Sequence, residues 1–281
     1  MKKIGLIDYY LDEYHAHVAS ANVASASEKL GYDFKVYGAY AERDSEGGLT
    51  TDEFCEKYGL VKYESIEELA KNVDCFIILS PDNNEKKEGY AKETIKYGKP
   101  IFMDKTFTDS YESAVRIFDA ADKVGVPLFS SSSLRYAEEL VPFKTDSTSV
   151  LVTGSGVMLE MYAVHYLEII ISCMGVGVCS VRHEMRGQQE WLHIEYKDGR
   201  HATAAISMGE YLDFRVFLTD REGITKDLTI ESNIFALQMR DVIEFFATGK
   251  PSFDRAETLE LMRVMDAIFK SKRNKGKWVN L

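Results

Sequence analysis

Two short apolar runs decide the fold of this chain: Cys75-Phe76-Ile77-Ile78-Leu79 and Ile101-Phe102-Met103. Continuous apolar runs without polar alternation are typical of strands that are covered on both faces, as they are in a parallel sheet. An amphipathic segment that ends at Gly98 lies between the two runs, and the same alternation of strand and helix extends through residues 1–133. This pattern predicts a doubly wound parallel sheet, which is a Rossmann-like α/β domain.

The second half of the chain has a different rhythm. Residues 178–218 contain runs in which apolar and polar residues partly alternate, and Asp198-Gly199 between two of them is typical of a hairpin turn. Helices are expected over residues 158–174, 234–248 and 255–272. We therefore predict two domains, residues 1–133 and residues 134–281, the second being an α+β domain built on a mostly antiparallel open sheet.

The composition excludes several classes of protein. The chain of 281 residues has 34 lysines and arginines against 45 aspartates and glutamates, a net charge of −11, so it is a poor candidate for binding nucleic acid or an anionic membrane. It has neither an apolar run of about 18 residues, the length of a membrane span, nor an apolar secretory region behind Met1-Lys2-Lys3. Its four cysteines form no Cys-x-x-Cys pair. We therefore expect a cytoplasmic protein with reduced thiols.

Ligands of an open parallel sheet bind at the carboxyl ends of its strands. In this chain those ends are polar, and they lie at residues 8–13, 40–43, 80–84, 104–106 and 130–135. Lys105 directly follows a buried strand, so its ammonium group is expected to stand over the cleft at the sheet edge. The alternative is an ordinary surface lysine at the end of a strand.

Several segments, taken in order, carry a pattern that extends over most of the chain. They are residues 63–69, 73–81, 98–106, 134–136, 162–175, 246–251, 265–271 and 276–279. Their order and spacing resemble the glucose–fructose oxidoreductase and inositol dehydrogenase family, often written Gfo/Idh/MocA. Asp104-Lys105-Thr106 is similar to the Glu-Lys-Pro signature of that family, and His165 stands on a helix that resembles the one carrying its active-site histidine.

The resemblance implies an NAD(P)-dependent oxidoreductase that acts by hydride transfer on a sugar, cyclitol or related polyol-like molecule. Residues 1–133 would then bind the dinucleotide, and residues 134–281 the substrate. Lys105 would hold the substrate oxygen, and His165 would act as general acid or base. The other implied substrate-binding residues are Arg135, Tyr136 and Tyr162. The implied cofactor-binding residues are Asp8, Tyr9, Tyr10, Leu11, Glu42, Arg43, Ser80, Pro81, Asn83, Asp104 and Lys105.

Two residues after the second strand bear on the choice between NAD and NADP. Glu42 is placed to accept hydrogen bonds from an adenosine ribose, which favours NAD, whereas Arg43 beside it leaves NADP open. In the second domain, Arg135 is suited to an anionic or polyhydroxy substrate, and an interdomain salt bridge is the equal alternative. His165 by itself is better explained as a histidine of the helix core, and only the family resemblance reverses that preference. His165 and Glu168 are spaced for a shared metal, but no third ligand lies on that helix face, so we expect no metal site.

The first loop departs from the family pattern. The family opens with a Gly-x-Gly-x-x-Gly/Ala turn, which lets the backbone approach a diphosphate at a helix N-terminus. Here the stretch is Asp8-Tyr9-Tyr10-Leu11-Asp12-Glu13, which has no glycine and carries three carboxylates. The stretch between the arginine segment and the histidine helix is also short, and the aspartate that precedes the histidine by four residues in the family is Met161 here. The alternative is therefore a noncatalytic or regulatory small-molecule-binding protein that kept the fold and lost the dinucleotide site.

The apolar side chains within residues 178–218 predict self-association. They lie on more than one face of the expected strands, for instance Trp191, Ile194 and Phe217. Helices 158–174 and 234–248 were expected to cover one face of that sheet, which leaves the other exposed. A patch of that size is unusual on a soluble monomer, and pairing with a second copy across a two-fold axis would bury it. We therefore expect a homodimer or a larger homo-oligomer, with a small molecule as its other partner.

Overall fold

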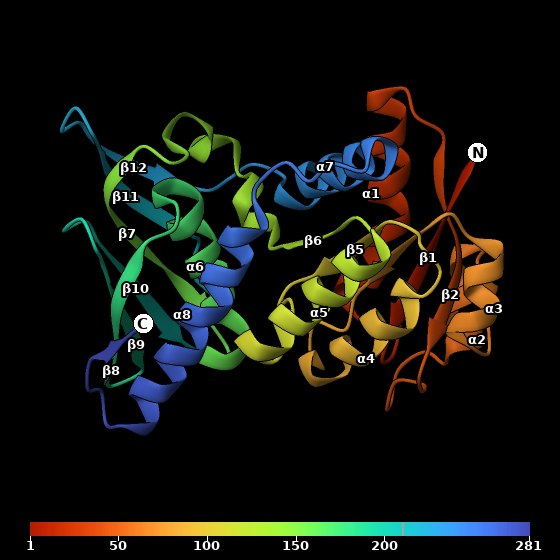
Figure 1. Ribbon diagram of the computed structural model, residues 1–281, viewed down its shortest axis with the longest axis horizontal. Coiled ribbons are helices and arrows are strands. Elements are labelled where there is room, and N and C mark those ends of the chain that lie inside the picture. The colour runs from red at the N-terminus through yellow and green to blue at the C-terminus, as the bar shows by residue number, and fades with distance from the viewer. Residues whose placement is uncertain (210) are drawn as a thin grey trace. The chain divides into compact units, whose positions relative to one another are not determined.

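The computed structural model describes residues 1–209 and 211–281, and they form two compact units. The first unit consists of Met1–Ser131 and Phe235–Phe253, and the second of Ser132–Ile234 and Asp254–Leu281. The chain therefore leaves the first unit near the boundary expected at residue 133 and later returns to it for one helix (Figure 1).

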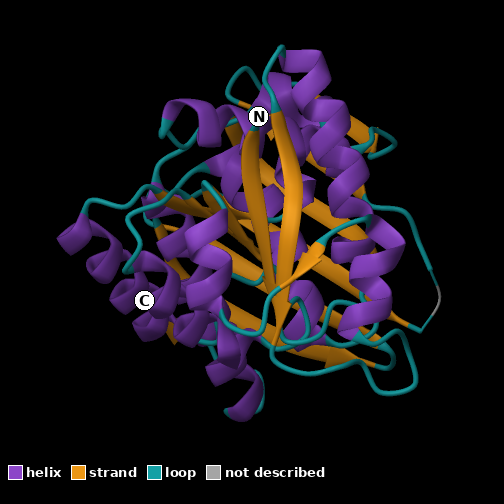
Figure 2. Ribbon diagram, turned by 90° about the vertical axis from the view of Figure 1, so that its right-hand side faces the viewer, coloured by secondary structure: helices purple, strands orange, loops and turns teal. Residues whose placement is uncertain are grey.

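A parallel sheet forms the centre of the first unit, with strand order β3-β2-β1-β4-β5-β6. This is the order of the classic dinucleotide-binding fold. The strands are β1 (Lys2–Asp8), β2 (Phe34–Ala41), β3 (Val61–Lys62), β4 (Cys75–Ile78), β5 (Ile101–Asp104) and β6 (Leu128–Ser131). β4 and β5 are the apolar runs of the sequence, and every residue of both is buried, because helices flank the sheet (Figure 2). The predicted Rossmann-like sheet is confirmed.

The helices of this unit begin and end at ordinary signals. They are α1 (Tyr14–Leu30), α2 (Thr51–Tyr58), α3 (Ile66–Asn72), α4 (Asn84–Ile95) and α5 (Tyr111–Val124). Thr50 and Glu53 form a capping box at the start of α2, and Ser110 caps α5. Gly125 ends α5 in the left-handed region at φ 75°, where a side chain would be strained. The segment that was expected to end at Gly98 is α4, whose last helical residue is Ile95.

Helix α7 (Ile234–Thr248) belongs to the first unit from Phe235 onwards. Its buried side chains, such as Val242 and Phe245, join the core cluster that contains residues of β1 and α1, and Figure 1 shows α7 beside α1. The prediction that this helix covers the second sheet was wrong. An amphipathic pattern shows that a helix buries one face, but it does not show which sheet that face meets.

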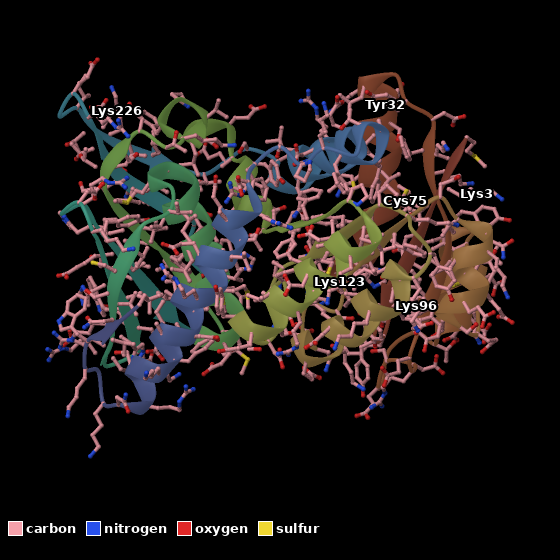
Figure 3. All side chains as sticks on the ribbon, in the orientation of Figure 1. Lys3, Tyr32, Cys75, Lys96, Lys123 and Lys226 are labelled. Atoms are coloured by element: carbon pink, nitrogen blue, oxygen red, sulfur yellow. The ribbon has the colours of Figure 1, made fainter. Side chains whose placement is uncertain are left out.

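The second unit contains a mixed sheet of order β12-β11-β7-β10-β9-β8-β13. The strands are β7 (Ser147–Gly156), β8 (Val178–Arg186), β9 (Gln189–Tyr196), β10 (His201–Met208), β11 (Arg215–Asp220), β12 (Thr225–Thr229) and β13 (Val279–Asn280). β7 and β10 pair in parallel and the other pairs are antiparallel, so the mostly antiparallel sheet is confirmed. β12 and β13 were not predicted, and Figure 3 shows Lys226 of β12 at the exposed hairpin with β11.

Two helices of this unit pack on its sheet. α6 (Leu159–Met174) lies against β7 and β10, and α8 (Arg255–Arg273) lies against β8. Two 3₁₀ helices, Ser133–Tyr136 and Glu138–Phe143, precede β7. In the described part of the chain no helix is both long and apolar enough to cross a membrane. The cysteines are free thiols, and Cys75 lies buried at the start of β4 (Figure 3).

Candidate functional site

The carboxyl end of β1 carries a buried acid. Asp8 is the last residue of β1, and its Oδ1 accepts hydrogen bonds from the backbone amides of Tyr9 (2.7 Å) and Ser80 (2.9 Å) and from the Ser80 hydroxyl (2.9 Å). Its Oδ2 is buried and has no hydrogen-bond partner among residues 1–209 and 211–281. Burial raises the pKa of Asp8 to about 7, although these hydrogen bonds favour the ionised form. Asp8 therefore exchanges its proton near neutral pH.

A second acid occupies the N-terminus of α1. Glu13 is the N-cap residue, and its carboxylate accepts hydrogen bonds from the backbone amides of His15 (2.7 Å) and Ala16 (2.5 Å). Burial and the nearby charge of Asp8 raise the pKa of Glu13 to about 8. Amides at a helix N-terminus normally favour a bound anion. In this chain the carboxyl group of Glu13 takes that place.

The first turn of α1 also meets the end of β5. His15 Nδ1 lies 2.8 Å from Asp104 Oδ2, with 15% of the histidine side chain and 3% of the aspartate side chain exposed. Burial alone would lower the pKa of His15, but the interactions with Asp104 and the charge of Glu13 together outweigh it and the pKa is raised. Burial alone would raise the pKa of Asp104, but His15, together with Lys87 and Lys105, keeps it below its ordinary value. Both effects favour an ion pair.

Lys87 of α4 supports the segment that follows β5. Its ammonium nitrogen is fully buried and donates to the carbonyl oxygens of Asp104 (2.8 Å), Lys105 (2.9 Å) and Thr106 (2.7 Å). The peptide bond between Lys105 and Thr106 is cis. Burial lowers the pKa of Lys87 to about 7. These bonds set the direction in which the Lys105 side chain leaves the backbone.

Lys105 is buried to all but 7% of its surface. In the part of the chain that the structure describes, its ammonium group has neither a hydrogen-bond acceptor nor an ion-pair partner. The hydroxyl of Thr106 beside it is buried and also without a partner there. Buried polar groups are nearly always satisfied, so a set of unsatisfied ones beside Lys105, here Asp8 Oδ2, Asp104 Oδ2 and the Thr106 hydroxyl, indicates a place for a polar ligand.

A groove of about 520 Å³ lies beside this cluster at the ends of β1, β2 and β4. It is lined by Tyr9, Tyr10, Asp12, Arg43, Ser45, Glu46, Asp82 and Asn83. The ring of Tyr9 has the guanidinium of Arg43 at 5.8 Å and the ammonium of Lys86 at 4.9 Å from its centroid. The structure therefore brings four of the predicted cofactor-binding residues together, namely Tyr9, Tyr10, Arg43 and Asn83.

Other predicted cofactor-binding residues have partners of their own or are buried. Glu42 accepts from Lys86 (2.6 Å) and from the Tyr90 hydroxyl (2.7 Å), so its carboxylate is already engaged. Leu11 is 1% exposed and belongs to the hydrophobic core, and Pro81 is buried. Ser80 is bound to Asp8. Their roles toward a cofactor remain predictions.

The predicted substrate-binding residues lie in the second unit. His165 of α6 makes a 2.8 Å hydrogen bond through Nδ1 with the hydroxyl of Ser132, whose amide donates to Glu168 (3.1 Å). Arg135 is buried, pairs with Glu168 and lies 2.7 Å from Glu257, and these charges raise its pKa. Its guanidinium is thus bound within this unit.

Two tyrosines were predicted beside these residues. The ring of Tyr162 meets His165 edge-on at 5.7 Å, and Tyr136 lies 5.9 Å from the ammonium of Lys144. Tyr162 and His165 are therefore neighbours on α6, whereas Tyr136 lies on the 3₁₀ helix that contains Arg135. Among the described residues, no group of three or more histidine, cysteine, aspartate and glutamate side chains is placed to hold a metal ion.

Three residues at the ends of β1 and β5 were not predicted as site residues from the sequence, namely Glu13, His15 and Lys87. Glu13 carried the signal of an N-cap, an acidic residue directly before an apolar periodic segment. His15 was placed on α1 but not at the end of β5, because that contact joins segments far apart in the sequence. Lys87 had no signal, since a lysine on a polar helix is usually exposed.

The family described as an oxidoreductase family with an NAD-binding Rossmann fold, Gfo/Idh/MocA, matches residues 16–132. Within the first unit the chain is therefore similar to this family. The match begins after the glycine-free loop and covers the strands and helices that hold Lys87, Asp104 and Lys105. No curated protein matches the chain significantly.

Solved structures share the fold of this chain. GenD2 from gentamicin A biosynthesis, in complex with NAD, has a TM-score of 0.78 at 14% identity over 100% of this chain and 97% of that chain. An oxidoreductase from Agrobacterium radiobacter, in complex with NAD+, L-tartaric acid and magnesium, has 0.77 at 13% over 99% and 98%. UDP-N-acetylglucosamine 3-dehydrogenase GnnA from Acidithiobacillus ferrooxidans has 0.73 at 13% over 96% and 96%. At these identities the similarity shows the fold.

The matched family is described as NAD-binding, but the first loop of this chain does not fit a dinucleotide diphosphate as it stands. The α1 amides that a diphosphate would use are bound by Glu13, and the amides of Tyr9 and Ser80 are bound by Asp8. A diphosphate placed there would meet two carboxyl groups in place of donors. The groove lined by Tyr9, Tyr10 and Arg43 could still take an aromatic ring.

Proposed function

We propose that this protein is an oxidoreductase that acts on a sugar, cyclitol or related polyol-like small molecule by hydride transfer, with NAD or NADP as the partner that the matched family implies. The observation that carries the proposal is Lys105, a residue only 7% exposed whose ammonium group has no partner in the described residues, at the carboxyl end of a strand of a Rossmann-like sheet. Lysine in that position is suited to a neutral or developing negative oxygen of a substrate.

The residues of the chain support the two parts of such a reaction. Lys105 would bind the substrate oxygen and lower the pKa of its hydroxyl, because a cation favours the alkoxide over the neutral form. His165 would hold or release a proton, with its ring oriented by the bond to Ser132. The fit of the first loop requires that Glu13 first leaves the α1 amides, so we derive no step that passes through the dinucleotide.

One observation favours a second function. Because Glu13 and Asp8 satisfy the donors of the dinucleotide site, the protein would also be suited to bind a polyol-like molecule without oxidising it, as a noncatalytic or regulatory protein. This alternative keeps Lys105 as the ligand-binding group and gives the dinucleotide no role.

A turnover assay separates the two functions. The wild-type protein and Lys105→Met would be incubated with NAD+ or NADP+ and a panel of aldoses, inositols and alditols, and reduced nicotinamide would be followed by absorbance. Turnover by the wild type that is lost in Lys105→Met supports the oxidoreductase. Thermal stabilisation by a member of the panel without turnover, again lost in Lys105→Met, supports the binding protein. If the wild type showed neither turnover nor thermal stabilisation with any member of the panel, the assignment of Lys105 to a substrate oxygen would be refuted.

A further inference from the structure

His15 differs from the histidine that follows it on the same helix. His17 uses both ring nitrogens, Nδ1 with the Tyr58 hydroxyl (2.7 Å) and Nε2 with Asp12 (2.8 Å). His15 Nδ1 lies 2.8 Å from Asp104 Oδ2 as an ion-pair contact without hydrogen-bond geometry, and its Nε2 has no partner among residues 1–209 and 211–281. Since 15% of the His15 side chain is exposed, the free nitrogen is not sealed in the core.

The imidazole ring of His15 is held in a defined orientation. Tyr14 and Phe235 meet the ring edge-on, at centroid distances of 6.0 Å and 5.3 Å. Asp104 is itself fixed, because it ends a buried strand and its carbonyl oxygen accepts from Lys87. A carboxylate on Nδ1 selects the tautomer in which the opposite nitrogen is free to take up a proton. The arrangement is the one that orients a general acid–base histidine.

Charged groups of every neighbouring strand and helix act on this ring. Asp104 and Glu13 favour its protonated form, and Lys105 opposes it. Asp8 of β1 and Lys87 of α4 act on the same cluster through Glu13, Asp104 and each other. From α7, the neighbours in the small cavity beside His15 are Phe235, Gln238 and Met239, which carry no charge.

We propose that His15 and Asp104 form a proton-transfer pair in the first unit, which acts on an oxygen atom of a hydroxy or carbonyl compound bound by Lys105. His15 is the acid–base group and Asp104 is its positioning residue. The pair is additional to His165. The chemical class of the ligand rests on the proposed function, whereas the existence of the pair rests on the 2.8 Å contact of His15 with Asp104 and on the fixed orientation of the His15 ring.

The proton balance of the step is simple. When a hydroxyl group is deprotonated, its proton moves to Nε2 of neutral His15, the other proton stays on Nδ1 next to the Asp104 carboxylate, and the ring becomes an imidazolium. The electron pair of the broken O–H bond remains on the oxygen, beside the Lys105 ammonium. In the reverse direction the imidazolium returns that proton to the alkoxide. Because Asp104 raises the pKa of His15, the resting ring is suited to giving a proton.

Carbethoxylation of the full chain with diethyl pyrocarbonate tests the pair without substrate or cofactor. The reagent acylates a neutral, accessible imidazole nitrogen, so the rate at His15, followed by peptide mass spectrometry across pH, reports both access to Nε2 and the midpoint of its titration. Asp104→Asn should shift that midpoint downwards by about one pH unit. At pH values below the midpoint, the carbethoxylation rate at His15 should then rise ~tenfold. Lys105→Met should shift it upwards. His17 is the internal control and should react slowly in all three proteins.

The opposite signs of the two shifts distinguish the pair from an ordinary buried contact. A His15 that reacts only after unfolding, or a midpoint that neither variant moves, would overturn the proposal. If Asp104→Asn does not fold, the upward shift of the His15 midpoint in Lys105→Met still tests the proposal, since that shift requires the charge of Lys105 to act on the His15 ring.

The turnover assay adds a second readout when the wild type turns over a member of the panel. His15→Asn should lower kcat at least ~10²-fold and remove the pH dependence on that group, and His17→Asn should leave kcat unchanged. A fully active His15→Asn enzyme would overturn the catalytic role. Absence of turnover in the wild type would instead count against the proposed function. The carbethoxylation experiment would still test whether His15 and Asp104 form the pair.

Discussion

The carboxylate of Glu13 accepts a hydrogen bond from the backbone amide of His15 at 2.7 Å and so caps the helix that a dinucleotide diphosphate would use. In the usual nucleotide fold that amide is left for the ligand, because glycines in the preceding loop carry no side chain. Here the carboxyl group of Glu13, in that loop, accepts the hydrogen bond from this amide. The same helix turn then presents His15 to the end of β5.

Removing the carboxylate of Glu13 should strengthen dinucleotide binding. We expect wild-type protein to bind NADH and NADPH weakly, and Glu13→Ser to bind at least ~tenfold more tightly, about 1.4 kcal/mol, because serine still caps the helix but carries no charge. Isothermal titration calorimetry measures this. Glu28→Ser, an exposed carboxylate near the other end of α1, is the matched control. Submicromolar binding by the wild type would show that the loop is not impaired.

Asp8 should make the protein less stable as pH rises. Its pKa is about 7 in the folded state, above the ordinary value near 4, so the folded chain holds a proton that the unfolded chain releases. The resulting stability is present at low pH and is lost as pH rises from about 4 to above about 7. Asp8→Asn should therefore gain stability relative to wild type across that window. Urea unfolding at several pH values tests this, with the exposed Asp119→Asn as control. A difference between Asp8→Asn and wild type that stays constant with pH would contradict it.

Substitutions of the neighbouring residues Lys87 and Lys86 should change the free energy of unfolding by different amounts. Lys87→Met should lower the free energy of unfolding by about 3 kcal/mol, because buried carbonyl oxygens after β5 lose their donor. Lys86→Met removes a partly exposed pair with Glu42, and such pairs contribute about 0–1 kcal/mol. Denaturant unfolding of both variants compares them. Equal losses would show that the buried bonds of Lys87 do not stabilise the segment.

Lys105 and His165 should affect turnover far more than stability. Each alanine variant is expected to lose at least ~10²-fold in kcat/KM while keeping nearly the wild-type Tm, because neither side chain is an anchor of the hydrophobic core. Steady-state kinetics with a substrate from the panel, together with thermal unfolding, provide both readouts. An unchanged rate in Lys105→Ala would remove the mechanism that the family implies.

We propose that the second unit pairs with its own copy through the face of its sheet opposite α6 and α8. Leu151 and Phe217 are cross-strand partners there and are partly exposed, as is Trp191. Light scattering at micromolar concentration should give at least twice the 31.9 kDa of one chain, and Phe217→Arg should shift the mass toward one chain. A wild-type mass of 31.9 kDa would show that this face needs no partner.

The sequence by itself determined the parallel sheet and the position of Lys105. Apolar runs such as residues 75–79 can be buried on both faces only in a covered sheet, and the residue after such a run must emerge at the sheet edge. These are local consequences of the chain, so periodicity and composition were sufficient. The glycine-free loop was visible for the same reason, because its residues are consecutive.

Only the tertiary structure decided what fills that loop and where α7 packs. The amphipathic face of α7 fits either sheet, and the choice depends on the shape of a core assembled from distant segments. Likewise, the contact of His15 with Asp104 and the bonds from Lys87 to the chain after β5 join residues that are far apart in sequence. Their pKa shifts arise from burial and from each other's charges, and both exist only once the strands have brought those side chains together.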